Sequence, residues 1–198
     1  PAAQKLRKLL HYGQIFQSHA LHFFYLASPD LLFGADAPIE KRNVIAVAVE
    51  NKELARRGIL MRKFGQEIIK AIAGKKIHGI AAVPGGMHKT FEPAERDYFL
   101  HGKDVPGIDT MIEWTQGVIT FLKDYYAKHR TTMDSFAAFP SGHLGMVTPN
   151  GQMEMYDGPL RAIDSEGNVT LPDVSTDLYQ KYFLEAVERW SYMKFPYL

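Results

Sequence analysis

Hydrophobic positions recur every three or four residues through most of the first 135 residues, which predicts long α-helices. The clearest apolar face, with Ile68 and Ile72 on it, ends at Gly74, a residue that commonly ends a helix. The Ser28-Pro29-Asp30 sequence is expected to stop the first helix. Helices are predicted at about 2–26, 38–51, 53–73, 92–101 and 111–128.

The pattern changes at residue 136, where apolar and polar residues alternate around turn sequences. The Pro149-Asn150-Gly151 sequence predicts a hairpin turn. We therefore expect a helical body over 1–135, a β-rich insertion over about 136–171, and a C-terminal helix over 172–198 that returns to the body. The predicted fold is mainly α, a bundle of long helices with a small antiparallel β insertion, and α+β overall.

The first helix is unusual because the stretch from Leu9 to Pro29 contains no Asp, Glu, Lys or Arg. Its polar residues gather on one face when they are plotted at 100° per residue. That face holds His11, Gln14, Ser18, His22 and Tyr25, with His19 at its edge, and the opposite face holds Phe16, Ala20, Phe23 and Phe24. A face exposed to water usually carries Lys or Glu, so we interpret this neutral stripe as facing a polar interior, a cofactor or a partner protein. The alternative is a stripe that meets solvent.

His19 and His22 lie three residues apart and could share a metal ligand. A metal site needs three or four ligands, and the sequence places no carboxylate nearby and contains no HExxH motif. We therefore predict no metal ligand among these histidines. A structural role for the pair stays open.

A loop rich in glycine, histidine and proline follows the helix that ends at Gly74 and carries His78. Gly85 and Gly86 allow backbone conformations that other residues avoid, or a close approach to a ligand. The spacing matches neither a Walker loop nor a dinucleotide-binding motif. From the residues alone, this loop is either a shaped structural turn or a recognition loop.

The 198 residues contain no cysteine, which excludes disulfides, thiolate metal sites and iron–sulfur ligation within the chain. A net charge of +1 gives no field that would gather nucleic acid, and no run is apolar enough for a membrane span. We expect a cytoplasmic protein. An uncapped first helix and the apolar Phe195-Pro196-Tyr197-Leu198 end suggest a piece excised from a larger subunit, the alternative being a small domain after tag removal.

Four motifs in register carry a resemblance to a known family. They are Gln17–Phe24, Ser28–Asp30, Arg62–Glu67 and the loop from Gly74 through His78 to Gly86. Together they resemble the large, catalytic subunit of nickel–iron hydrogenases, in particular the soluble, bidirectional, NAD-reducing group. The likeness extends over nearly the whole chain. The family's two Cys-x-x-Cys metal-binding pairs are absent, so the chain resembles the central segment of such a subunit.

The resemblance implies reversible H2 oxidation coupled to NAD reduction in the full complex, with this segment inactive alone. It implies a Ni–Fe(CO)(CN)2 centre whose ligands lie outside this chain, and iron–sulfur clusters, FMN and NAD in partner subunits, namely the diaphorase subunits and the hydrogenase small subunit. It places Ser18, His19 and His22 near the metal pocket, as proton-relay or positioning residues. His78 would face an iron–sulfur cluster of the small subunit. Ser18 replaces a residue that is acidic in many relatives, which puts its role in doubt.

Two alternatives remain at the level of sequence. The quinone-site subunit of respiratory complex I shares this ancestry and lacks the metal-binding cysteines, although the Ser18–His22 run and the Val83–Gly86 sequence fit the hydrogenases better. A self-standing helical interaction domain without chemistry would instead fold alone and leave no large apolar surface exposed.

Overall fold

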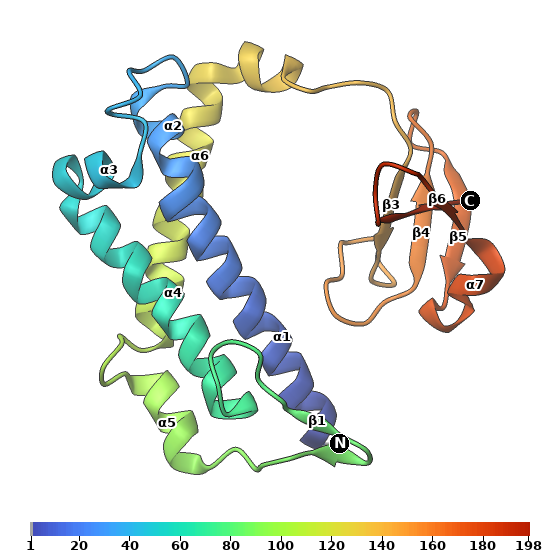
Figure 1. Cartoon of the computed structure of the whole chain (residues 1–198), viewed down its shortest axis with the longest axis horizontal. Helices are drawn as coiled ribbons and strands as arrows, with labels where there is room; N and C mark the ends of the chain where they lie inside the picture. The colour runs from blue at the N-terminus through green and yellow to red at the C-terminus, as the bar shows by residue number, and fades with distance from the viewer. Residues whose placement is uncertain (1) are drawn as a thin grey trace. The chain divides into compact units, whose positions relative to one another are not determined.

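A computed structural model describes residues 2–198, which fall into two compact units. One unit ends at Met133 and is helical, and the other, Asp134–Leu198, is mostly β (Figure 1). The expected α+β class, with long helices and small antiparallel sheets, is confirmed. No helix among residues 2–198 is both long and apolar enough to cross a membrane.

The chain begins with one unbroken helical path of three parts. Helix α1 (Ala2–Leu21) passes into a π-helical turn, η1 (His22–Ala27), and then into α2 (Ser28–Phe33). The predicted stop at Ser28-Pro29-Asp30 is therefore wrong. A proline inside an α-helix removes a backbone donor and collides with the carbonyl four residues earlier, and the wider π-turn just before Pro29 relieves that collision.

Helix α3 (Val44–Glu50) leads directly into α4 (Lys52–Ala73), which agrees closely with the predicted 53–73 helix. The α3 helix is shorter than expected because Asn43 caps it. The Asn43 side-chain oxygen accepts hydrogen bonds from the amides of Ile45 and Ala46, at 3.0 and 3.1 Å. Gly74 ends α4 in the left-handed conformation, with φ of 77°.

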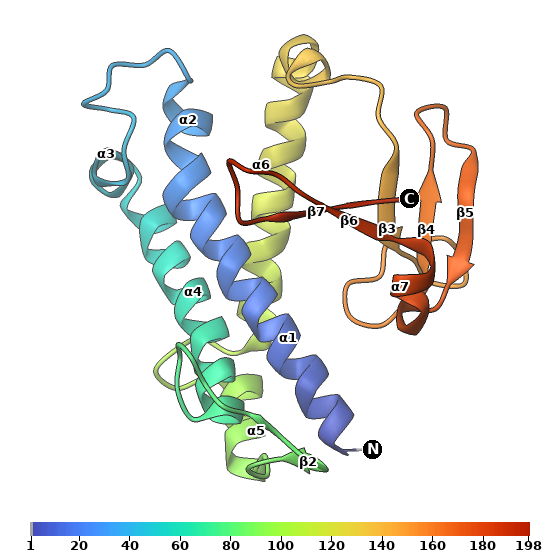
Figure 2. The same cartoon turned by 45° about the vertical axis from the view of Figure 1, so that its right-hand side comes forward.

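Helices α1 and α4 pack against each other in opposite directions and form the centre of the helical unit (Figures 1 and 2). Glycines let the two backbones approach closely. A Cβ atom at Gly65 would lie 2.8 Å from the carbonyl oxygen of Gly13. The core around this contact includes Phe24, Met61, Phe64, Ile72, Met111 and Trp114.

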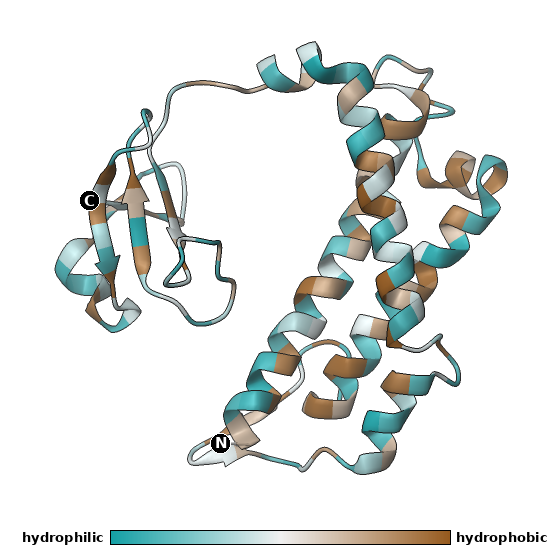
Figure 3. Ribbon diagram, turned by 180° about the vertical axis from the view of Figure 1, so that it is seen from behind, coloured by the Kyte–Doolittle hydropathy of each residue, from teal (hydrophilic) through white to brown (hydrophobic). Residues whose placement is uncertain are grey.

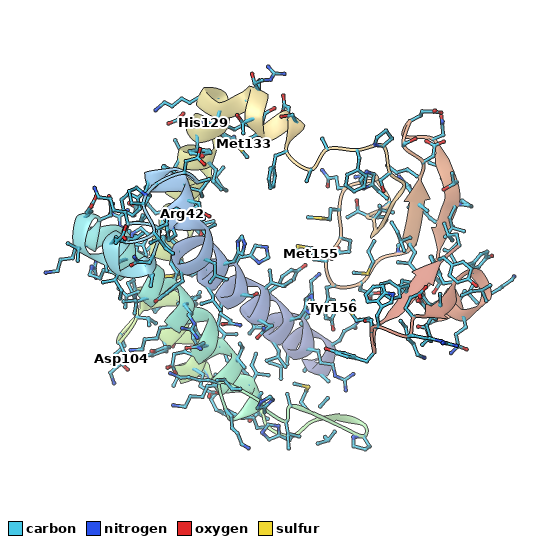
Figure 4. All side chains as sticks on the ribbon, turned by 45° about the horizontal axis from the view of Figure 1, so that its top comes forward. Arg42, Asp104, His129, Met133, Met155 and Tyr156 are labelled. Carbon is cyan, nitrogen blue, oxygen red and sulfur yellow. The ribbon has the colours of Figure 1, made fainter. Side chains whose placement is uncertain are left out.

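Two more helices complete this unit. Helix α5 (Pro93–His101) starts with a capping box, in which the Glu92 amide donates to the Glu95 carboxylate at 3.0 Å. Helix α6 (Ile108–Ser135) is longer than the predicted 111–128 helix and is kinked at His129. The His129 ring stacks on Tyr125 at 4.3 Å, and Figure 4 labels His129 and Met133 in the last turns of α6. Brown apolar segments alternate with teal polar ones along these helices (Figure 3).

The second unit holds a three-stranded antiparallel sheet of β3 (His143–Met146), β4 (Leu160–Ile163) and β5 (Val169–Val174). The predicted turn at Pro149–Gly151 forms, yet it carries only an isolated bridge between Val147 and Met153 rather than a strand pair. The sheet's small core consists of Ala162, Leu171, Val174 and Phe183.

The helix predicted for 172–198 is wrong at the level of secondary structure. After β5, only α7 (Tyr179–Tyr182) is α-helical, and β6 (Leu184–Val187) pairs with β7 (Lys194–Tyr197) as a hairpin. Pro196 cannot donate a ladder hydrogen bond and suits such a two-stranded edge better than a helix interior. The segment has helical spacing of apolar residues, but that spacing alone does not exclude a strand, and packing in the second unit decides the outcome.

Candidate functional site

The polar stripe of the first helix lies where the sequence predicted it, along one face of α1 and the start of the π-turn. Ser18, His19 and His22 are exposed, whereas Ala20 and Phe24 on the other side are buried. The division into two faces is therefore confirmed. Within the part of the chain that the structure describes, the stripe lies on the surface of the helical unit rather than in its core.

His19 is held in one orientation by its own helix. Its ring Nδ1 lies 2.9 Å from the carbonyl oxygen of Ile15, one turn earlier. A carbonyl only accepts hydrogen bonds, so this contact requires a proton on Nδ1. In the neutral ring, Nε2 then carries the free lone pair and points away from that carbonyl. This arrangement suits a group that takes up and releases a proton, because one nitrogen fixes the ring and the other stays available.

His78 lies in the loop between α4 and the small β1–β2 hairpin (Ala82–Val83 and Gly86–Met87). Its backbone has φ of 52°, a left-handed conformation that is uncommon for a residue with a side chain. The imidazole is exposed. Strain of this kind tends to persist where the surrounding structure requires it.

Several contacts attach the loop to the helices, among them an ion pair between Lys76 and Glu67 of α4 at 2.6 Å. Ala81 is buried in the core, and its carbonyl accepts the His88 amide at 3.0 Å. The Arg7 guanidinium donates to the Gly86 carbonyl at 3.0 Å and so joins the hairpin to the start of α1. Arg7 and His19 are twelve residues apart, about 18 Å along a helix. The β1–β2 hairpin that follows His78 is therefore attached about three helical turns before His19.

No group of three or more His, Asp or Glu side chains that could hold a metal ion is found among residues 2–198. The chain also has no cysteine. Its own residues therefore do not fit a thiolate-bound nickel–iron centre or an iron–sulfur cluster.

Comparisons with known proteins give a consistent result. The chain is 44% identical over its whole length to the beta subunit of the NAD-reducing hydrogenase HoxS of Cupriavidus necator, of which it covers 41%. It is 36% identical over 99% of its length to a subunit of the F420-non-reducing hydrogenase vhu of Methanococcus voltae, of which it covers 45%. A crystal structure of an NAD+-reducing [NiFe]-hydrogenase in the H2-reduced state matches with a TM-score of 0.90 and 42% identity, over all of this chain and 43% of that one. No protein-family model matches.

The chain is similar over its whole length to subunits of hydrogenases. It spans about two fifths of the length of these relatives. The sequence-based assignment to a large, catalytic subunit does not agree with these findings and is corrected: the Cupriavidus necator relative is named as a beta subunit, and neither its name nor that of the Methanococcus voltae relative designates a large catalytic one.

Sequence reasoning missed two polar groups beside the π-turn. Ser28 is only 1% exposed, and its hydroxyl donates to the Phe24 carbonyl at 2.7 Å. Arg62, on α4, has a buried Nε atom that lacks a hydrogen-bond partner, and its guanidinium carbon lies 5.9 Å from the centre of the Tyr25 ring. The signal for Ser28 was the uncharged stretch itself, because a serine in a buried helix can bond only to a nearby carbonyl.

Proposed function

We propose that this chain forms part of a subunit of a hydrogenase complex that oxidises H2 and reduces NAD. The observation that carries this proposal is the 44% identity over the whole chain to one component of an NAD-reducing hydrogenase. The solved structure that matches the full chain is also an NAD+-reducing enzyme. The overall reaction balances as H2 and NAD+ giving NADH and one proton, so the complex must carry one net proton to water in each turnover.

In this proposal the chain supplies side chains rather than metal ligands. The nickel–iron centre of the complex, held by residues outside these 198, supplies the cleavage of H2 when it is bound. His19 and His22 relay protons along the exposed face of α1, and Ser18 donates or accepts one hydrogen bond in the same stripe. The fixed ring of His19, with Nδ1 bonded to the Ile15 carbonyl, is the geometric support for this role.

The proton-relay proposal can be tested in the complete complex with His19→Ala and His22→Ala. We expect hydrogen–deuterium exchange to fall at least tenfold and its pH profile to shift, since a positioned proton-transfer group contributes about 10²–10⁴ in rate. Added imidazole should restore part of the exchange. His101→Ala is the matched control, because it removes another exposed histidine at the end of α5. Unchanged exchange and an unchanged pH profile in both α1 variants would reduce the stripe to a packing surface.

We further propose that His78 faces an iron–sulfur cluster held by a partner protein of the complex. Its exposed imidazole can donate an N–H hydrogen bond to a cluster sulfur, and such bonds raise a cluster's reduction potential. His78→Asn removes the imidazole and keeps a residue that tolerates the left-handed backbone. A potentiometric titration followed by electron paramagnetic resonance should show one cluster potential lowered. If all cluster potentials match those of the unmodified complex, this role for His78 is wrong.

The electron acceptor of the complex needs a test of its own. The relatives from Cupriavidus necator and Methanococcus voltae differ in this respect by name, and the chain is more similar to the NAD-reducing one. Reduction of NAD by the purified complex under H2, followed by the absorbance of NADH, tests the acceptor directly. A complex that consumes H2 with a viologen dye and leaves NAD unreduced would contradict NAD as the acceptor while preserving hydrogenase activity.

A further inference from the structure

A cavity of about 390 Å³, partly open to solvent, lies in the helical unit between the π-turn, the first half of α4 and α6. Three aromatic rings form much of its wall: Phe23 from the π-turn, and Trp114 and Phe121 from α6. The Phe23 and Phe121 ring centres are 6.3 Å apart. Ligand sites typically measure about 300–1,000 Å³, and the volume of this cavity lies in that range.

The polar groups of the cavity gather on one side, at the start of α4. Asn51 lines the cavity, and its side chain makes no capping hydrogen bond to the helix. Arg57 also lines it, with its guanidinium carbon 5.4 Å from the Trp114 ring centre. The third polar residue, Ser28, already donates its hydroxyl proton to a backbone carbonyl. Asn51 and Arg57 are thus the side chains that can orient a ligand.

The charge at this side of the cavity is positive. The Glu53 carboxylate forms ion pairs with Arg56 at 2.9 Å and with Arg57 at 3.0 Å. One negative charge therefore faces two positive guanidinium groups. Helix α4 begins at Lys52, and the positive end of its dipole lies in the same place. An anionic group at the cavity mouth would neutralise the second positive charge. The N–H groups of Arg57 that do not bond to Glu53 could bind this anion through two hydrogen bonds.

We propose that this cavity binds a small anionic amphiphile, a monocarboxylate with an apolar body on the order of eight to ten carbons. The apolar body lies between Phe23, Trp114 and Phe121, and the carboxylate lies against Arg57 and Asn51. The size follows from the volume, because a dry apolar cavity of roughly 150 Å³ already accommodates benzene. The site is separate from the histidine stripe and does not depend on the hydrogenase proposal.

The two tryptophans of the chain are Trp114, in the cavity, and Trp190, in the other unit, so Trp190→Phe leaves one fluorescent reporter at the site. The chain carrying this change is titrated with 10-bromodecanoate, whose bromine quenches an indole that it contacts. We expect saturable quenching of Trp114. The neutral 10-bromodecanol should bind about tenfold more weakly, since it lacks the charge that Arg57 recognises.

Two matched pairs of variants locate the site. Arg57→Gln should weaken 10-bromodecanoate about tenfold, whereas Lys52→Gln removes an exposed charge from the start of the same helix without lining the cavity. Gly117→Leu should abolish quenching by filling the cavity, because a Cβ at Gly117 meets no heavy atom within 4 Å. Gln116→Leu, its exposed neighbour on α6, should leave the affinity unchanged. Circular dichroism confirms that each variant is folded.

Three results would overturn the proposal. One is equal weakening by Lys52→Gln and Arg57→Gln, which would mean that bulk charge alone attracts the ligand. Another is unchanged quenching in a folded Gly117→Leu variant, which would place the ligand outside the cavity. The third is equal affinity for the carboxylate and the alcohol, or no saturable quenching by either.

Discussion

The Ser28 hydroxyl donates a hydrogen bond of 2.7 Å to the Phe24 carbonyl at the end of the π-turn. In this turn the Ser28 amide bonds to the Phe23 carbonyl, five residues earlier. By the same register, the next amide would bond to the Phe24 carbonyl, but residue 29 is a proline and has no N–H. The serine side chain thus replaces the donor that the proline lacks, and the helical path continues through the two residues.

Ser28→Ala should lower the free energy of unfolding by about 1–3 kcal/mol, because it leaves the buried Phe24 carbonyl without a donor. Thr115→Ala is the control: its hydroxyl also bonds to a carbonyl one turn earlier, that of Met111, at 2.8 Å, yet a helical backbone amide is available to that carbonyl. Urea unfolding measures both. Pro29→Ala restores a backbone N–H, so it should reduce the loss of unfolding free energy that Ser28→Ala causes. If the effects of the two substitutions on stability are simply additive in the double mutant, this explanation is wrong.

Gly65→Ala should destabilise the helical unit by about 1–3 kcal/mol, because the added Cβ would lie 2.8 Å from backbone atoms of both Gln17 and Gly13. Gly117→Ala should act in the opposite direction. Its Cβ meets nothing within 4 Å, and alanine favours a helix over glycine by up to about 1 kcal/mol. Denaturant unfolding of both variants checks the prediction, and equal stability of the two would contradict the close approach of α1 and α4.

The pKa of Glu53 is lowered from 4.5 to about 2 by hydrogen bonds from Arg56 and Arg57. Because the folded form holds this carboxylate ionised, the stability it contributes is fully present above pH 4.5 and is lost as the pH falls toward about 2. Carbon-13 NMR of the Glu53 carboxyl measures this titration. In Arg56→Gln and Arg57→Gln the pKa should move back toward its ordinary value, and a pKa that stays near 2 in both would exclude these arginines as the cause.

His78 has φ of 52°, so the side chain at this position affects stability through the backbone. His78→Val should destabilise the chain by about 1–2 kcal/mol, because a β-branched residue is poorly suited to the left-handed region. His78→Gly, which adopts this conformation freely, should leave the stability unchanged or raise it slightly. Thermal unfolding distinguishes the two variants. Similar melting temperatures for His78→Val and His78→Gly would show that the loop relaxes to another conformation.

Part of this molecule follows from local sequence alone. The periodic apolar face of α4 and its end at Gly74, and the division of α1 into a neutral polar face and an apolar face, depend on spacing and on residue conformation. Both are properties of a few consecutive residues, so reading the sequence was enough to predict them. The absence of cysteine likewise determined that these 198 residues hold no thiolate-bound metal.

Only the tertiary structure decided the rest, because the local patterns there are compatible with more than one conformation and burial selects between them. Ser28-Pro29 has the pattern of a stop, and it continues the helix only because the serine hydroxyl satisfies a carbonyl in a buried setting. The 172–198 segment has helical spacing, yet β6 finds its partner in β7 and Phe183 joins the core of the sheet. Arg57 on α4 and Trp114 on α6 line the same cavity, although they lie far apart in the sequence. Local propensity cannot encode such contacts, since their free energy comes from burial and pairing across the fold.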